Sequence, residues 1–212
     1  MYYLITLHYK VLDFSKHLAN INNRRNNNGY CKCLTLQLRK HLKPKFMTRI
    51  KEASTEDIKL INEMAWKVFP ATYSEILSKE QIEYMMEWMY SIENITKQIT
   101  EEGHIYYIAF KEDKAMGYVS IQKEDRNLFH LQKIYVLPEF QKEHIGKLLF
   151  NHAVSEIRRI NGAPCRMNLN VNRNNKALGF YKHMGMKKTS EGDFPIGNGY
   201  YMNDYIMSLD IE

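Results

Sequence analysis

The sequence predicts an α/β (α+β) fold class: a mixed, mostly antiparallel central sheet of six to seven strands flanked by helices. The chain has 212 residues, 44% of them hydrophobic and 25% charged, which suits one globular domain with a real core. Residues 54–101 carry apolar positions at helical spacing, whereas residues 104–137 form apolar-rich runs separated by polar turns. Strand-like and helical segments then alternate towards the C-terminus.

The first strand and helix are predicted from a local capping signal. A short strand at Arg49–Ala53 precedes Ser54 and Thr55, either of which can cap a helix start. Two acidic residues follow in the first turn, where the helix dipole favours negative charge. We expect Pro70 to end this helix, because proline lacks an N–H group and clashes with the preceding turn.

The remaining elements follow from the periodicity and from the Gly, Pro and Asn-Gly breaks. Further helices are expected from Ser78 and over residues 92–101, and three strands lie within residues 104–137. The last predicted elements are a helix over 145–160, a strand over 166–171, a helix over 175–184, and strands over 187–190 and 200–209.

Residues 1–46 differ in composition from the rest of the chain. They hold nine Lys and Arg and one acidic residue, a net charge of +8, whereas residues 47–212 hold 21 basic and 23 acidic residues, a net charge of −2. We expect Met47 to be the natural start and residues 1–46 to be a disordered extension or a start-site artefact. The alternative is a basic arm that binds RNA or acidic partners. The mildly acidic domain disfavours nucleic acid and suits a cationic small substrate.

The sequence offers no sign of a membrane or metal protein. No apolar run approaches the ~18–20 residues of a membrane span, and the N-terminus lacks the basic start and cleavage site of a signal peptide. Cys31 and Cys33 are one residue apart and Cys165 is distant, which is not a zinc-ligand spacing. We therefore expect reduced thiols, no metal, and a cytoplasmic location.

Residues 134–150, IYVLPEFQKEHIGKLLF, form the segment that carries chemistry. A strand, a proline loop and a helix start follow one another. The first N–H groups of a helix lack intrahelical partners and carry partial positive charge, so they can bind a pyrophosphate. Gly146 lets a ligand approach the backbone, and Lys142 and Lys147 add charge. His144 still offers its N–H group, but a positive φ there would cost roughly 1 kcal/mol.

This segment resembles the acetyl-CoA motif of the GNAT (general N-acetyltransferase) superfamily. Gln141, Gly146 and Lys147 match the motif, while His144 stands where the family has its first glycine. Residues 170–186, NVNRNNKALGFYKHMGM, resemble a second GNAT segment. The matching positions there are Asn174, Ala177, Phe180, Tyr181 and Gly185, with Met186 in place of the usual phenylalanine.

The resemblance covers roughly residues 47–209 and implies a GNAT-like acyl-CoA N-acyltransferase fold. It implies acetyl-CoA as cosubstrate, Tyr181 as the acid that protonates the departing thiolate, and Asn174 as a cofactor contact. The full cofactor-binding set that it implies is Ile134, Tyr135, Val136, Gln141, Lys142, Glu143, His144, Ile145, Gly146, Lys147, Asn174 and Tyr181.

The general base, which takes the proton from the amine, is predicted from its position relative to the acetyl-CoA motif. His130 lies four residues before Ile134, where some GNAT enzymes carry a catalytic carboxylate, and an unperturbed histidine titrates near ~6.5. The alternative is a packed or exposed strand histidine. Glu87 is a second candidate for the base.

The acceptor is predicted from residues 69–91, FPATYSEILSKEQIEYMMEWMYS, which resemble the diamine and polyamine branch of the family. Acids and aromatics there could hold a flexible cation, and the predicted substrate-binding residues are Tyr73, Glu87 and Trp88. The alternative interpretation is that the methionine and aromatic side chains belong to the hydrophobic core and that the glutamates lie on a solvent-exposed helix face. Other candidate functions are acetylation of a protein N-terminus or lysine and a non-catalytic CoA-binding sensor. A homodimer is left open.

Overall fold

The structure is a computed structural model that describes residues 48–212. The predictions for residues 1–46, for Cys31 and Cys33 and for Met47 as the natural start lie outside the described residues. None of the helices in residues 48–212 combines the length and the apolarity that a bilayer crossing requires.

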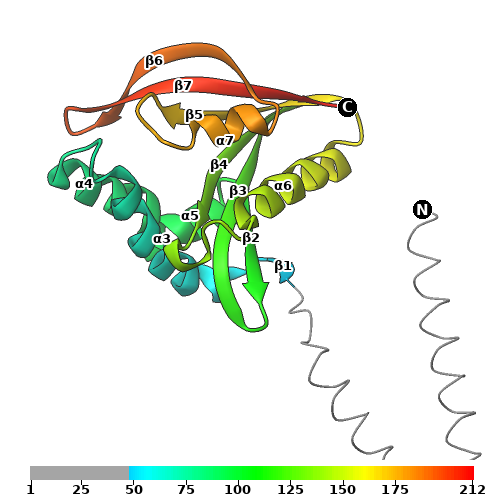
Figure 1. Cartoon of the computed structure of the whole chain (residues 1–212), viewed down its shortest axis with the longest axis horizontal. Coiled ribbons are helices and arrows are strands. Elements are labelled where there is room, and N and C mark those ends of the chain that lie inside the picture. Colours follow the sequence, from blue (N-terminus) through cyan, green and yellow to red (C-terminus); the bar gives the residue numbers. More distant parts are fainter. Residues whose placement is uncertain (1–47) are drawn as a thin grey trace, which may run out of the picture. The chain divides into compact units, whose positions relative to one another are not determined.

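A single seven-stranded sheet forms the centre of the described residues and confirms the predicted fold class (Figure 1). Its spatial order is β1-β2-β3-β4-β5-β7-β6, and every neighbouring pair is antiparallel except β4 and β5. The strands are β1 (Thr48–Glu52), β2 (His104–Lys111), β3 (Lys114–Asp125), β4 (Leu128–Val136), β5 (Cys165–Asn172), β6 (Lys187–Gly197) and β7 (Tyr200–Ile211).

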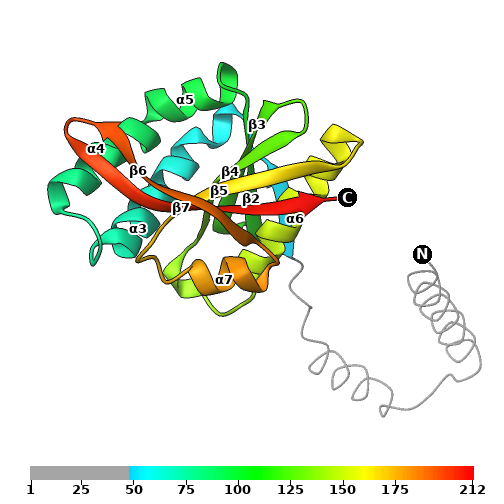
Figure 2. The same cartoon turned by 90° about the horizontal axis from the view of Figure 1, so that it is seen from above.

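Helices cover both faces of this sheet, as Figures 1 and 2 show. One face carries α3 (Ile58–Tyr73), α4 (Lys79–Tyr90) and α5 (Ile92–Thr100), and the other carries α6 (Ile145–Asn161). Ring contacts define the two sides: Phe69 of α3 meets Tyr135 of β4, whereas His152 of α6 meets Tyr107 of β2. A short helix, α7 (Leu178–His183), follows β5. The face under α3–α5 is called the acceptor face below, and the face under α6 the helix-α6 face.

The capping prediction for the first helix is confirmed. The Ser54 hydroxyl accepts a hydrogen bond from the Glu56 backbone N–H at 3.3 Å, and the Asp57 carboxylate accepts one from the Ser54 N–H at 2.9 Å. These contacts form a reciprocal capping box in front of a short 3₁₀ turn, Thr55–Asp57, that leads into α3. The Ser78 side chain caps α4 by accepting a hydrogen bond from the Gln81 N–H at 3.2 Å.

The prediction that Pro70 ends the first helix is wrong. Helix α3 continues through Pro70 to Tyr73, and the Ser74 N–H donates to the Pro70 carbonyl at 3.0 Å. Phe69 and Tyr73 on either side of the proline are buried in the core. Their burial offsets the lost hydrogen bond, a cost of roughly 3 kcal/mol in an exposed helix.

Two further boundaries differ from prediction. Strand β6 extends to Gly197 instead of Ser190, because it pairs along its whole length with β7. Helix α7 begins at Leu178 instead of residue 175. The side chain of Asn175 accepts a hydrogen bond from the Ala177 N–H at 2.8 Å, which holds residues 175–177 in a turn before the helix.

Candidate active site

The site lies where the two parallel strands separate. Strands β4 and β5 pair only from Leu128 opposite Arg166 to His130 opposite Asn168. Beyond these pairs the strands border a cavity of about 790 Å³. Its walls come from residues 131–136 of β4, residues 169–171 of β5, the loop and first turn around 140–147, helix α7 and the end of α3. The cavity therefore has walls from both faces of the sheet.

A β-bulge in β4 sets the direction of the side chains at this opening. Ile121 pairs with Leu131 and Ser120 with Lys133, so Gln132 has no opposite residue. The Gln132 amide donates instead to the Gln122 side chain at 2.7 Å. After the bulge, Lys133 and Tyr135 point to the acceptor face, where they meet rings of α4 and α3. The β4 edge beyond His130 borders the cavity, which is where backbone N–H groups could stabilise an oxyanion.

The turn before α6 has the backbone of an anion-binding loop. Lys142 has φ +72° and His144 has φ +61°, so two left-handed residues alternate in front of Ile145. Such alternation turns successive N–H groups towards one point. The first intrahelical bond is that from Leu148 N–H to His144 C=O, at 3.1 Å, which leaves the preceding helical N–H groups for a ligand. His144 thus has the positive φ whose cost the sequence analysis considered.

Most of the predicted cofactor-binding residues line this one cavity. Those that do are Ile134, Tyr135, Val136, Gln141, Lys142, His144, Ile145, Gly146, Lys147 and Tyr181. A Cβ added to Gly146 would lie 3.7 Å from Cζ of Phe180, so the first turn of α6 packs closely on α7. Acetyl-CoA fits this set, because backbone N–H groups with two lysines suit a pyrophosphate and Tyr181 lines the same cavity.

Two predicted cofactor residues lie elsewhere. The Glu143 carboxylate accepts a hydrogen bond from Lys111 Nζ at 3.1 Å and is not part of the cavity lining. Asn174 lines a smaller adjoining pocket of about 410 Å³, while its neighbour Asn175 lines the main cavity. Asn175 was missed because two asparagines stand side by side before the helix and the sequence pattern does not distinguish them. Thr72 of α3 is a second lining residue that the sequence analysis missed.

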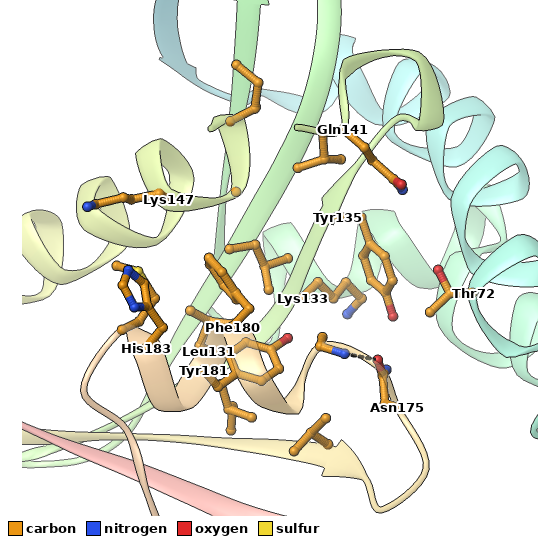
Figure 3. Close-up of a pocket in the computed structure, with 18 of the residues that line it drawn as sticks. Thr72, Leu131, Lys133, Tyr135, Gln141, Lys147, Asn175, Phe180, Tyr181 and His183 are labelled. Atoms are coloured by element: carbon orange, nitrogen blue, oxygen red, sulfur yellow. Dashed lines mark hydrogen bonds between the residues drawn. The ribbon is translucent and has the colours of Figure 1, made fainter. Parts of the chain in front are cut away.

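Tyr181 is buried in α7 and lines the cavity (Figure 3). Burial is the main cause that raises the pKa of its hydroxyl above the ordinary 10, and the electrostatic interaction with the Tyr73 hydroxyl raises it further. A phenol with a raised pKa keeps its proton near neutral pH. Tyr181 can therefore serve as a proton donor inside the cavity.

His130 forms a dyad with a carboxylate. Its Nδ1 lies 3.2 Å from Oε1 of Glu124 on β3. Burial lowers the pKa of His130 below 6.5, and the Glu124 charge opposes this shift. With Nδ1 held by Glu124, Nε2 is free to accept a proton. His130 is not part of the cavity lining, so its role as base stays a prediction.

Of the three predicted substrate-binding residues, one lines the cavity and two lie outside its lining. Tyr73 lines the cavity. Trp88 is 45% exposed and stacks on Tyr84 at a centroid distance of 6.2 Å, outside the lining. The Glu87 backbone carbonyl accepts a bond from Asn94 at 3.1 Å, and its side chain is also outside the lining. The assignments of Glu87 and Trp88 to the substrate stay predictions.

Two buried ionisable residues near the cavity were not predicted. Lys133 lines the cavity and lies 5.6 Å from the ring centres of both Tyr90 and Tyr106; burial lowers its pKa to about 7. On β7, burial raises the pKa of Asp204 to about 6. Both stand in strands whose other residues supply the sheet core, and one sequence alone gives no signal that sets them apart.

Similarity to known proteins agrees with this geometry. A family model described as an acetyltransferase (GNAT) domain matches residues 73–207. The spermidine N(1)-acetyltransferase of Thermoplasma acidophilum is 27% identical over 157 residues, covering 71% of this chain and 96% of that protein. The peptidyl-lysine N-acetyltransferase YjaB of Salmonella typhimurium is 27% identical over 103 residues, covering 48% of this chain and 63% of that protein. PaiA N-acetyltransferase from Thermoplasma acidophilum, solved in complex with coenzyme A, superposes with a TM-score of 0.64 at 25% identity, covering 76% of this chain and 98% of that chain.

Proposed function

Since this chain belongs to the GNAT acetyltransferase family, we propose that it acetylates a primary amine of a small polyamine-like molecule by direct attack on the acetyl-CoA thioester. The family membership makes the chain an acetyl-CoA-dependent N-acetyltransferase. The observation that supports the finer proposal is the single cavity that joins the anion-binding turn, the Tyr181 hydroxyl and the Tyr73 ring of α3.

The residues of the chain take defined parts in this reaction. Acetyl-CoA supplies the activated acetyl group. The turn at residues 141–146 binds the pyrophosphate through backbone N–H groups, and the β4 edge at Ile134–Val136 stabilises the charge that develops on the thioester oxygen. Tyr181 donates its proton to the sulfur that leaves. The new amide bond forms as the carbon–sulfur bond breaks.

A base is needed because alkyl amines have pKa values near ~10, so only about a thousandth of the acceptor is neutral at pH 7. We assign this part to His130. The contact of its Nδ1 with Glu124 at 3.2 Å supports the assignment, since it leaves Nε2 as the acceptor of the proton. Since His130 lies outside the cavity lining, the proton would pass to Nε2 through a water molecule.

The polyamine-like acceptor is supported by the 27% identity to a spermidine acetyltransferase over nearly the whole of that relative. The second candidate acceptor is a lysine or the N-terminus of a protein, and the peptidyl-lysine relative supports the lysine. Both acceptors are alkyl amines that would use the same residues. We also propose a cytoplasmic location, and a homodimer stays a prediction.

An amine panel tests the proposal. Thiol release from acetyl-CoA is measured with spermidine, spermine, putrescine, butylamine, a lysine peptide and a peptide with a free N-terminus. The highest kcat/KM should fall on a di- or polyamine. A peptide as the best acceptor would support the second candidate. CoA binding without turnover on any amine would indicate a non-catalytic CoA sensor.

A further inference from the structure

Two basic side chains at one end of the active-site cavity have no partner among the described residues. Lys147 of α6 and His183 of α7 both line the cavity, and both are exposed. Neither makes an ion pair, a hydrogen bond or a ring contact within residues 48–212. In this part of the chain no acidic residue lines the cavity, so both side chains remain available to an anionic ligand.

The packing of α6 on α7 brings these two side chains to the same end of the cavity. A Cβ on Gly146 would lie 3.7 Å from Cζ of Phe180, and the ring centroids of Phe150 and Phe180 are 6.1 Å apart. Lys147 directly follows Gly146, and His183 stands three residues after Phe180, about one turn along α7. Figure 3 shows Lys147 and His183 on the same side of Phe180.

This end of the cavity lies away from the reacting centre. Tyr181 and His183 are two residues apart on α7, which separates their side chains by roughly 200° around the helix axis. In Figure 3 the Tyr181 hydroxyl points away from both Lys147 and His183. Lys147 also follows directly on the turn that binds the pyrophosphate. With the thioester at Tyr181 and the pyrophosphate at the turn, the nucleoside end of CoA extends towards Lys147 and His183.

The C-terminal end of α7 does not repel an anion strongly at this place. The backbone carbonyls of residues 180, 181 and 182 accept hydrogen bonds from the N–H groups of Met184, Met186 and Gly185, at 2.9, 3.1 and 3.0 Å. These carbonyls are therefore satisfied within the chain. The Glu143 carboxylate, which is close to Lys147 in sequence, is bonded to Lys111 at 3.1 Å.

We propose that Lys147 and His183 bind the 3′-phosphate on the ribose of CoA and so distinguish CoA from 3′-dephospho-CoA. A phosphate monoester carries a charge of about −1.5 to −2 at pH 7 and offers three acceptor oxygens, which two basic side chains from different helices can share. The N–H groups of the turn are used by the pyrophosphate and do not serve this third phosphate. The inference goes beyond the proposed function and does not depend on which amine is the acceptor.

Calorimetric titration with CoA and with 3′-dephospho-CoA tests the assignment without any acceptor amine. The readout is the ratio of the two dissociation constants, because any contribution of Lys147 at the pyrophosphate cancels in it. The wild type should bind CoA about 10-fold more tightly than 3′-dephospho-CoA, as expected for two exposed charge-assisted contacts. Lys147→Met and His183→Gln should each reduce the ratio about threefold, and the double variant should bring it near 1.

Three matched variants serve as controls. Lys142→Met, in the turn itself, should weaken both nucleotides alike and leave the ratio unchanged. Lys182→Met removes an exposed charge beside His183 but outside the cavity lining, and it should change neither dissociation constant. Lys147→Arg keeps the charge and should keep most of the ratio. Thermal melts confirm that each variant is folded.

Equal affinity of the wild type for the two nucleotides would overturn the inference, and so would a failure to bind CoA. A ratio that survives in the folded double variant would also overturn it. If Lys142→Met abolished the ratio while the double variant kept it, the 3′-phosphate would lie at the turn instead. A normal ratio without turnover on any amine would refute only the proposed function.

Discussion

The Nζ of Lys133 on β4 lies 3.0 Å from Oε1 of Gln98 on α5, and the same Oε1 accepts the Tyr106 hydroxyl at 2.5 Å. The Gln98 amide nitrogen in turn donates to the Met89 carbonyl at 2.9 Å. The Gln98 side chain thus binds the buried amine of Lys133 and also links α5 to α4. Because desolvation disfavours the charged form of a lysine, this contact has a measurable pH dependence.

Lys133→Met should raise the unfolding temperature at pH 7. Burial lowers the pKa of Lys133 from 10.5 to about 7, so between these values the unfolded chain binds more protons than the native one. Wild-type stability should therefore rise as pH increases from 7 towards 10.5. In Lys133→Met this rise should flatten. Thermal melts across that pH range measure it, with the exposed Lys182→Met as control; parallel curves for wild type and Lys133→Met would contradict the buried-amine account.

Tyr181→Phe should lower kcat by about 10² or more, the usual size of a lost general acid. The dissociation constant of CoA should change little, because the ring and its packing remain. Tyr107→Phe is the matched control: its hydroxyl bonds Glu156 at 3.2 Å on the helix-α6 face and is not part of the cavity lining. Steady-state kinetics and CoA titration distinguish the two effects, and a normal kcat in Tyr181→Phe would remove this residue from the acid role.

His130 and Glu124 are expected to control the acid limb of the pH–rate profile. Burial lowers the pKa of His130 and the Glu124 charge raises it, while Lys133 adds to the lowering. In Glu124→Gln the opposing charge is lost, so the limb of kcat/KM should move to lower pH. His130→Gln should abolish the limb and reduce kcat. The profile is measured between pH 5 and pH 9 under standard assay conditions; a limb that survives in His130→Gln would show that another group is the base.

His144→Gly should increase the free energy of unfolding by about 0.5–1 kcal/mol. His144 has φ +61°, which costs a residue with a Cβ roughly 1–2 kcal/mol, and the greater freedom of glycine in the unfolded chain offsets part of the gain. Ser155→Gly, at an exposed position within α6, should instead lose about 0.5–1 kcal/mol. Denaturant unfolding compares the two variants. A less stable His144→Gly would mean that the imidazole contributes more than its backbone costs.

Much of this site could be read from the sequence because its parts are local. The turn at residues 141–146 and helix α7 are each defined by neighbouring residues, so most of their predicted positions line one cavity. What depends on distant residues was not predictable. Pro70 stays helical because Phe69 and Tyr73 are buried, and the burial of Asp204 depends on a strand, β7, that pairs with the distant β5. Trp88 is an aromatic residue of the kind that binds cationic substrates, but its ring stacks on Tyr84 outside the lining of the cavity.

The separation of β4 and β5 has a kinetic consequence. Because the cavity is lined by elements from both faces of the sheet, we expect it to hold the nucleotide and the amine at the same time. A ternary complex is then the natural reacting species, and steady-state velocity plots should intersect instead of running parallel. We therefore expect the acetyl group to pass directly from the thioester to the amine, without an acyl-enzyme.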